Sequence, residues 1–274
     1  MLDVMSQAQN AIEAYTEALK ASSANIANMN VPGYKKINVS FQSVFEKVLS
    51  RGTAADNNRG GTNPQQLGQG MALSQTSIDL SAGDLTTGSP IDLAISGSGF
   101  FIVSPDGGNT FLYSRAGNFE INANGSLTSN GMLVYGLDAS GNVVPITNLP
   151  SGNSANYQWL ADGTLQFTAD PTAAPPTYVN TGYSIALTYF ANPSGLVQAQ
   201  GTSFAETLAS GAAAAAQGPG GAVGTVKPGQ IEQSNVFFLG ESIASLELQR
   251  ALSANLSVIK LASDLVSSFI QKLG

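Results

Sequence analysis

The sequence predicts an α+β protein in which N- and C-terminal helices enclose a central antiparallel β-rich domain. Two observations predict this fold. Apolar residues repeat with heptad spacing at both ends of the chain, which is the pattern of helices that pack along one another. Between these ends, short runs of alternating polarity are separated by Gly- and Asn-rich turns, which is typical of antiparallel strands. We expect the two terminal helices to pair as an antiparallel coiled coil.

Residues 1–34 are predicted to form the N-terminal helical segment. Two rows of seven-residue spacing run along it, made of Met5, Ile12, Leu19 and Ile26, and of Ala8, Tyr15, Ser22 and Met29. At ~1.5 Å per residue the helix would be roughly 40 Å long. Pro32 cannot continue it. The alternative is an ordinary surface helix that packs on its own domain.

Three asparagines crowd the end of this helix. Asn25 and Asn28 lie three residues apart and share a helix face, and Asn30 lies at the exit. Their amides can bond backbone groups that a helix end leaves without partners. A stop signal accounts for Asn30 and Pro32 but not for the amides beside Ile26. We therefore expect a helix that meets its neighbours in one fixed register.

The middle of the chain has a different texture. Residues 35–80 are predicted to be an extended linker, residues 81–205 the β-rich domain, and residues 206–234 a Gly/Ala-rich linker that is flexible or extended rather than core-forming. Asn124-Gly125 and the run Ser140-Gly141-Asn142 predict hairpin turns between strands of the β-rich domain.

Residues 235–274 are predicted to form the C-terminal helix. One heptad row consists of Leu252, Ile259, Val266 and Leu273, and its partner row contains Leu248, Asn255, Ala262 and Phe269. A polar Asn in such a row commonly fixes register. Further apolar residues surround both rows, so this helix needs neighbours on more than one side. Other copies of the chain could supply them.

The composition excludes several classes of function. The chain has no Cys and no His, so the usual zinc sites, thiol nucleophiles and Ser-His-Asp triads are absent. We expect no enzyme activity, no metal and no cofactor. With 11 basic and 18 acidic residues the net charge is −7, which disfavours nucleic acid as a partner.

Neither a signal peptide nor a membrane span is predicted. The N-terminus lacks a basic region followed by a continuous apolar run, and no run reaches the ~20 apolar residues of a transmembrane helix. On these signals alone the protein would be placed in the cytoplasm.

Three stretches resemble the rod and hook subunits that build the axial structure of the bacterial flagellum. They are "ANIANMNVPGYKK" near the N-terminus, "IDLAISGSGFFIV" followed by "YSRAGNFEINANGSLTSNGMLVYG" in the middle, and "IEQSNV" with "LQRALSANLSVIKLASDLVSSFI" near the C-terminus. Ile26 and Val31 depart from the Asn and Thr that are usual there, and Leu252 stands where Tyr is usual. The run "FFLGES" replaces the common acidic stretch, so lateral contacts there could differ.

The resemblance implies a structural subunit that assembles head-to-tail into a helical tube, which transmits torque and forms an export channel. It implies partners in other copies of the chain, in adjacent rod and hook proteins and in the flagellar type III export apparatus. It also implies a location in the basal body or hook, after export without a cleavable signal. The terminal segments would be disordered in the free monomer and fold on assembly. The expected assembly interface consists of Met5, Ile12, Tyr15, Leu19, Asn25, Ile26, Asn28, Asn30, Pro32, Gly33, Tyr34, Leu248, Leu252, Asn255, Ile259, Val266 and Phe269.

Several alternatives stay open at this point. The length favours a distal-rod subunit, whereas the stretch from Gly60 to Leu73 is hook-like, so a compact hook subunit is the nearest alternative. A peptidoglycan-cutting enzyme would need a cleft domain that the sequence does not predict. A secreted carbohydrate-binding or adhesin β domain, with Tyr157 and Trp159 stacking on a sugar, would leave both terminal helices without a role.

Overall fold

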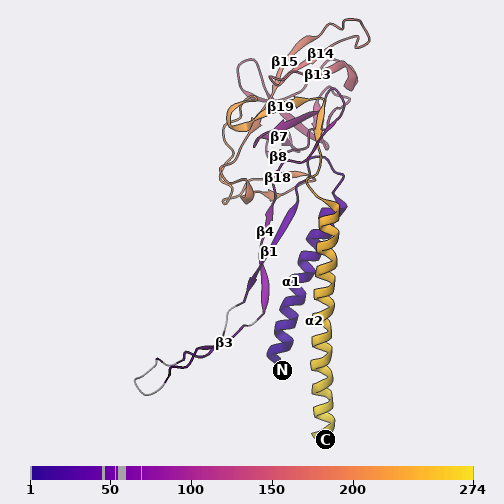
Figure 1. Cartoon of the computed structure of the whole chain (residues 1–274). Coiled ribbons are helices and arrows are strands. Elements are labelled where there is room, and N and C mark those ends of the chain that lie inside the picture. Colours follow the sequence, from indigo (N-terminus) through magenta and orange to yellow (C-terminus); the bar gives the residue numbers. More distant parts are fainter. Residues whose placement is uncertain (1, 45–46, 53, 55–59, 69, 274) are drawn as a thin grey trace. The chain divides into compact units, whose positions relative to one another are not determined.

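The computed structural model describes residues 2–44, 47–52, 54, 60–68 and 70–273. The chain divides into two units. The helical unit comprises residues 1–26, 37–77 and 237–274, and the β-rich unit comprises residues 27–36 and 78–236. The chain is thus α+β, with helices at both ends and an antiparallel β-rich region between them (Figure 1), as the sequence predicts.

Within its described residues, the helical unit contains α1 (Leu2–Ala27), α2 (Phe238–Leu273) and four strands. α1 ends where a turn begins, with the Val31 amide donating to the Asn28 carbonyl at 3.1 Å, just before Pro32. β1 (Ile37–Ser43) pairs with β4 (Met71–Ile78), and β2 (Lys47–Ser50) pairs with β3 (Gln65–Leu67). The linker expected at residues 35–80 is therefore extended, but it folds back on itself as paired strands.

The β-rich unit is built around a sheet of 12 strands, whose main path runs β13-β14-β15-β11-β7-β8-β18-β17. The strands of this sheet are β7 (Phe100–Ser104), β8 (Leu112–Ser114), β9 (Phe119–Ile121), β10 (Leu127–Ser129), β11 (Met132–Leu137), β12 (Val143–Pro145), β13 (Tyr157–Trp159), β14 (Thr164–Phe167), β15 (Val179–Ile185), β16 (Leu187–Thr188), β17 (Val197–Gln198) and β18 (Ser203–Ala205). Short 3-10 turns occur at Ser154–Asn156, Pro193–Gly195 and Gly221–Val223.

Both predicted hairpin turns are confirmed. β9 and β10 pair in antiparallel register around Asn124-Gly125, with Leu127 opposite Ile121. β11 and β12 pair around Gly141, which has φ +82°. Glycine tolerates this left-handed conformation without steric cost, so the sequence fixes the position of each turn.

Two further strand pairs overturn part of the linker prediction. β19 (Thr225–Pro228) pairs with β6 (Leu93–Ser96), and β20 (Gln230–Glu232) pairs with β5 (Leu85–Thr87). Val223 and Val226 belong to the hydrophobic core. The expectation that this linker forms no part of the core is therefore wrong for Val223 and Val226, because these apolar residues lie within a Gly/Ala-rich composition that is typical of linkers.

The main hydrophobic core of the β-rich unit is dominated by aliphatic and aromatic side chains from its strands. Leu93, Phe101 and Leu165 are fully buried. The indole nitrogen of Trp159 donates to the Ile91 carbonyl at 2.6 Å, which satisfies a polar group that burial would otherwise leave unpaired. The unit thus has a complete core of its own.

Candidate assembly surfaces and the terminal junction

The buried stripe of α1 consists of small residues. Its buried members are Ala8, Ala11, Ala14, Ala18, Ser22 and Asn25. Met5, Ile12, Tyr15, Leu19 and Ile26, which the heptad pattern places in the interface, are only half-buried. Small residues let neighbouring backbones approach closely, whereas the larger ones flank the contact and keep part of their apolar surface exposed.

A polar cluster joins the end of α1 to the beginning of α2. The Ser22 hydroxyl lies 2.9 Å from Glu241 Oε2 and 2.9 Å from the Ser245 hydroxyl. Asn25 Nδ2 donates to Glu241 Oε2 at 3.3 Å. Glu241 is 5% exposed, so these donors compensate a buried carboxylate. Directional polar contacts of this kind specify one helix register.

Asn25 also holds β1. Its Nδ2 donates to the Ile37 carbonyl, and its Oδ1 accepts from the Ile37 amide, both at 2.9 Å. Sequence reasoning expected the asparagine amides to bond backbone groups, and Asn25 bonds the backbone of a following strand. Asn28 is half-buried and Asn30 is exposed in the turn after α1.

The predicted heptad rows of α2 divide into two parts. Leu248, Leu252, Asn255 and Ile259 are half-buried, and Ala262 is buried. Asn255 donates to the Ala251 carbonyl of its own helix at 2.9 Å. From residue 263 to residue 272 every residue is exposed. Val266 and Phe269 therefore lie in a stretch of α2 that the rest of the chain leaves uncovered.

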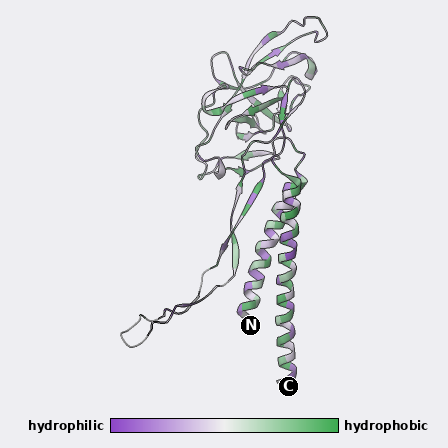
Figure 2. Cartoon of the chain, viewed as in Figure 1, coloured by the Kyte–Doolittle hydropathy of each residue, from purple (hydrophilic) through white to green (hydrophobic). Residues whose placement is uncertain are grey.

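α2 exposes far more apolar surface than is usual for a helix of a monomeric protein. Figure 2 shows hydrophobic residues along its length. Those that are exposed are Phe238, Leu239, Ile243, Leu246, Leu256, Val258, Leu261, Leu265, Val266, Phe269 and Ile270. We call these residues the apolar face of α2.

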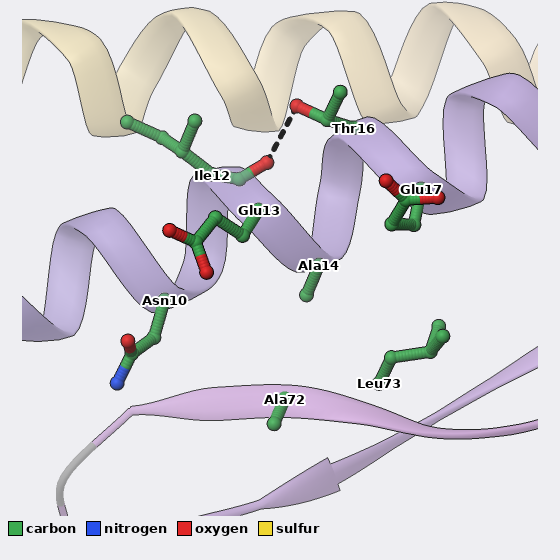
Figure 3. Close-up of a pocket in the computed structure, with 8 residues that line it drawn as sticks. All are labelled: Asn10, Ile12, Glu13, Ala14, Thr16, Glu17, Ala72 and Leu73. Carbon is green, nitrogen blue, oxygen red and sulfur yellow. Dashed lines mark hydrogen bonds between the residues drawn. The ribbon is translucent and has the colours of Figure 1, made fainter.

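A groove of about 620 Å³ runs between α1 and β4. Asn10, Glu13, Ala14 and Glu17 of α1 line it together with Ala72 and Leu73 of β4, and Ala14 points toward the strand (Figure 3). A second pocket is lined by Ala8 and Ala11 of α1, Met71 of β4, and Asn255 and Val258 of α2. Within the helical unit, α1 lies between α2 and β4 (Figures 1 and 3).

The β-rich unit contains a buried cluster of three charged side chains, Lys35, Arg115 and Glu232. We call this cluster, with the backbone groups that bond to it, the terminal junction. Lys35 Nζ donates to Glu232 Oε1 at 2.6 Å, and both side chains are fully buried. Arg115 Nη1 lies 3.6 Å from Glu232 Oε2, and its guanidinium lies 4.9 Å from the centre of the Phe100 ring. Burial lowers the pKa of Lys35 and of Arg115 below their ordinary values, although Glu232 acts in the opposite direction on both.

Backbone groups complete the terminal junction. The Gly33 amide donates to the Glu232 carbonyl at 2.8 Å, and the Gly83 amide donates to Glu232 Oε1 at 3.0 Å. Lys35 Nζ also donates to the Ser81 carbonyl at 2.7 Å. Three segments that are distant in sequence therefore meet at one carboxylate.

The side chain of Asn235 links the backbone at Lys36 to the backbone at Asp79 through hydrogen bonds. Its Oδ1 accepts from the Lys36 amide at 2.8 Å, and its Nδ2 donates to the Asp79 carbonyl at 2.8 Å. The Asp79 amide in turn donates to the Lys36 carbonyl at 2.8 Å. These three bonds form a closed ring through one side chain.

Gly33 and Tyr34, which the sequence places in the assembly interface, lie in the terminal junction. Both are buried, and Pro32 beside them is half-buried. Gly33 has φ +69°, and a Cβ on it would come within 2.3 Å of the Ala116 amide nitrogen. Only glycine fits this close approach. Any effect of these two residues on assembly would act through the fold of the β-rich unit.

Sequence reasoning missed Lys35, Arg115 and Glu232 as members of one site. The available signal was their position within the quoted stretches "PGYKK", "YSRAG" and "IEQSN", each of which supplies one charge. Nothing in the spacing of the three residues predicts that they meet, because the strands between them decide it.

Among the residues that the structure describes, no group of three or more acidic side chains is arranged to hold a metal ion. No helix within the described ranges is long and apolar enough to cross a membrane. Tyr157 and Trp159 are 0% and 3% exposed, so the alternative in which they stack on a sugar is wrong.

Two family models match the chain. The model of the flagella basal body rod protein matches residues 5–35, and the model of the flagellar hook protein FlgE/F/G D1 domain matches residues 94–168. Both matches fall on regions described above, the first on α1 and the turn after it, the second on the β-rich unit. The fold and these matches define a structural protein of the flagellar rod and hook class.

Curated relatives narrow the class. The chain is 32% identical to the flagellar basal-body rod protein FlgG of Bacillus subtilis over 249 residues, which cover 90% of the chain and 89% of that protein. It is 32% identical to FlgG of Caulobacter vibrioides, with 91% of each chain covered. The flagellar hook protein FlgE of Helicobacter pylori is 39% identical, but over 46% of the chain and 18% of the hook protein. The chain belongs to the family of flagellar basal-body rod proteins FlgG.

Proposed function

We propose that this chain is a rod subunit of the bacterial flagellum that assembles with copies of itself, head-to-tail, into a helical tube. The tube transmits torque and encloses the channel through which other subunits are exported. The family is structural rather than enzymatic. The observation that carries the proposal is the apolar face of α2, which remains exposed in one copy of the chain.

Within one subunit, α1 and α2 pair as an antiparallel coiled coil. Ser22 near the end of α1 contacts Ser245 near the start of α2, whereas Ala8 near the start of α1 lines a pocket with Val258. Contacts in this order are those of antiparallel helices. α2 has 36 residues and α1 has 26, so 36 − 26 = 10 residues of α2 have no counterpart in α1.

Between subunits, the apolar face of α2 packs on neighbouring copies. Its residues lie on several sides of the helix, so more than one neighbour is needed to cover them. The contact joins different surfaces of the two copies, and such a heterologous contact produces an open filament unless the rotation closes a ring. The expected interface positions Val266 and Phe269 belong to this face. Rod and hook proteins next in the axial structure are the further partners, and the flagellar type III export apparatus delivers the chain.

The matched substitutions Leu261→Gln and Leu208→Gln test this proposal. Leu261 lies on the apolar face of α2 and is 62% exposed, whereas Leu208 lies in a loop of the β-rich unit and is 105% exposed. A buried Leu contributes roughly 1.5–3 kcal/mol, and every ~1.4 kcal/mol is tenfold in affinity. We expect Leu261→Gln to raise the critical concentration for polymerisation, measured by sedimentation, about tenfold or more.

Leu208→Gln should leave the critical concentration unchanged, and both variants should keep the unfolding temperature of the monomer. Equal polymerisation of the Leu261→Gln variant and the unmodified chain would contradict the proposed role of α2.

A further inference from the structure

We propose that the terminal junction is a charge-dependent clasp in which Glu232 is the positioning residue that holds the entering and leaving segments of the β-rich unit together before assembly. The inference concerns the single subunit. It rests on the proposed function only for its consequence, which is that torque passed along the chain enters the β-rich unit through this clasp.

The position of the clasp in the chain supports this role. The chain passes between its two units four times, after residues 26, 36, 77 and 236. Lys36, Asp79 and Asn235, which form the closed ring of hydrogen bonds, are each next to or near one of these passages. Force carried by the covalent chain from α1, β1, β4 or α2 therefore reaches the ring and the carboxylate beside it first.

The charges of the clasp are unequal. Lys35 and Arg115 carry two positive charges and Glu232 carries one negative charge, all on buried side chains. Removing Lys35 leaves a balanced Arg115–Glu232 pair. Removing the Glu232 charge takes away the carboxylate that pairs with both buried cations and leaves only the weaker attraction of Asp79 on Lys35. Leaving buried cations without a paired carboxylate costs more than removing one of the two cations. The cost of removing one of these three charges therefore depends on whether the other two are present. Packing alone would not produce this dependence.

Hydrogen exchange in the dilute, full-length monomer tests the clasp. The reporters are the amides of Gly33, Lys36 and Asp79, because their acceptors belong to the junction. We expect Glu232→Gln to speed their exchange at least tenfold, and Lys35→Met to have a smaller effect. The amide of Ile102, in the β7–β8 pair, should change little and serves as an internal reference.

The double variant Lys35→Met/Glu232→Gln gives the decisive comparison. It removes one of the two buried cations that lose their paired carboxylate in Glu232→Gln, so its reporter amides should exchange more slowly than those of Glu232→Gln alone. Gln233→Ala is the control, because Gln233 bonds only Thr86 through its side chain amide in the described structure and should leave the reporters unchanged.

Two results would contradict the proposed clasp. One is that the reporter amides of the double variant exchange as fast as those of Glu232→Gln, or faster. The other is that Glu232→Gln leaves the exchange rates of the reporter amides unchanged. If Glu232→Gln fails to fold, the double variant is compared with Lys35→Met instead. A double variant that folds then shows that removing Lys35 rescues the loss of the Glu232 charge. A double variant that does not fold contradicts the clasp. Polymerisation of the unmodified chain is measured separately. Its absence would contradict the proposed function and leave the result in the monomer intact.

Discussion

At the scale of single residues, the geometry of the turn after α1 depends on the absence of a side chain at Gly33. Gly33 combines a left-handed φ with a close approach to the backbone of Ala116. Gly107 has a similar φ of +74°, but no atom lies within 4 Å of the position that its Cβ would take. The two glycines therefore separate the cost of backbone strain from the cost of a steric clash.

We expect Gly107→Ala to lower the free energy of unfolding by about 1 kcal/mol, the cost of a strained backbone alone. Gly33→Ala should lower it by at least about 2 kcal/mol more, because the new methyl group must displace buried backbone. Denaturant unfolding of the monomer measures both values. Equal losses would show that the contact with Ala116 is not constraining.

Tyr113 gives the β-rich unit a defined response to alkaline pH. Burial, aided by the charge of Glu206, raises the pKa of Tyr113 from 10.0 to about 12. Between these values the unfolded chain releases the proton while the folded chain retains it, so the folded state binds more protons and stability falls as the pH rises. Below pH 10 this contribution is fully present.

Thermal unfolding on both sides of pH 10 measures this effect. We expect the unfolding temperature to fall more steeply above pH 10 in the unmodified chain than in a Tyr113→Phe variant, which has no phenol to ionise. Tyr135 and Tyr157, whose pKa values burial also raises, contribute to the slope that remains in the variant. Identical slopes in the two proteins would show that Tyr113 ionises as easily when folded.

At the scale of elements, the register of α1 depends on polar contacts rather than on its large apolar residues. Asn25 is 1% exposed and bonds both β1 and Glu241, whereas Asn30 is exposed. Asn25→Ala leaves buried partners unsatisfied, which costs about 1–3 kcal/mol. We expect it to lower the temperature at which polymers disassemble, measured by light scattering.

Asn30→Ala is the matched control and should change the disassembly temperature little, since substitutions at exposed positions usually stay within about 0.5 kcal/mol. If the two variants disassemble alike, the polar cluster at Glu241 does not fix the helix pair.

The elements also show how far the sequence predicts the fold. Helices at both ends and the hairpins at Gly125 and Gly141 follow from local patterns, because periodicity and turn chemistry act over a few residues. The strand pairs of residues 225–232 do not, since their partners lie about a hundred residues or more away and their composition resembles a linker. For the same reason the heptad rows indicated the helix but not that alanines would be its buried stripe.

At the scale of the whole molecule, the two units differ in how much of their apolar surface is buried. The β-rich unit has a buried hydrophobic core, whereas the helical unit leaves many apolar side chains exposed. The β-rich unit has two clusters of buried aromatic and aliphatic residues. The helical unit leaves the apolar face of α2 exposed, and the sequence predicted this need for neighbours because the C-terminal helix is apolar beyond its two heptad rows. The terminal junction could not be predicted in the same way, because its three charges come from segments far apart in the chain.

Electron microscopy of the concentrated full-length chain tests the central claim most directly. We propose that the exposed apolar face of α2 packs on other copies through a heterologous contact, and we therefore expect regular open tubes of uniform diameter. A population of single particles, or of closed dimers that do not grow with concentration, would contradict this account.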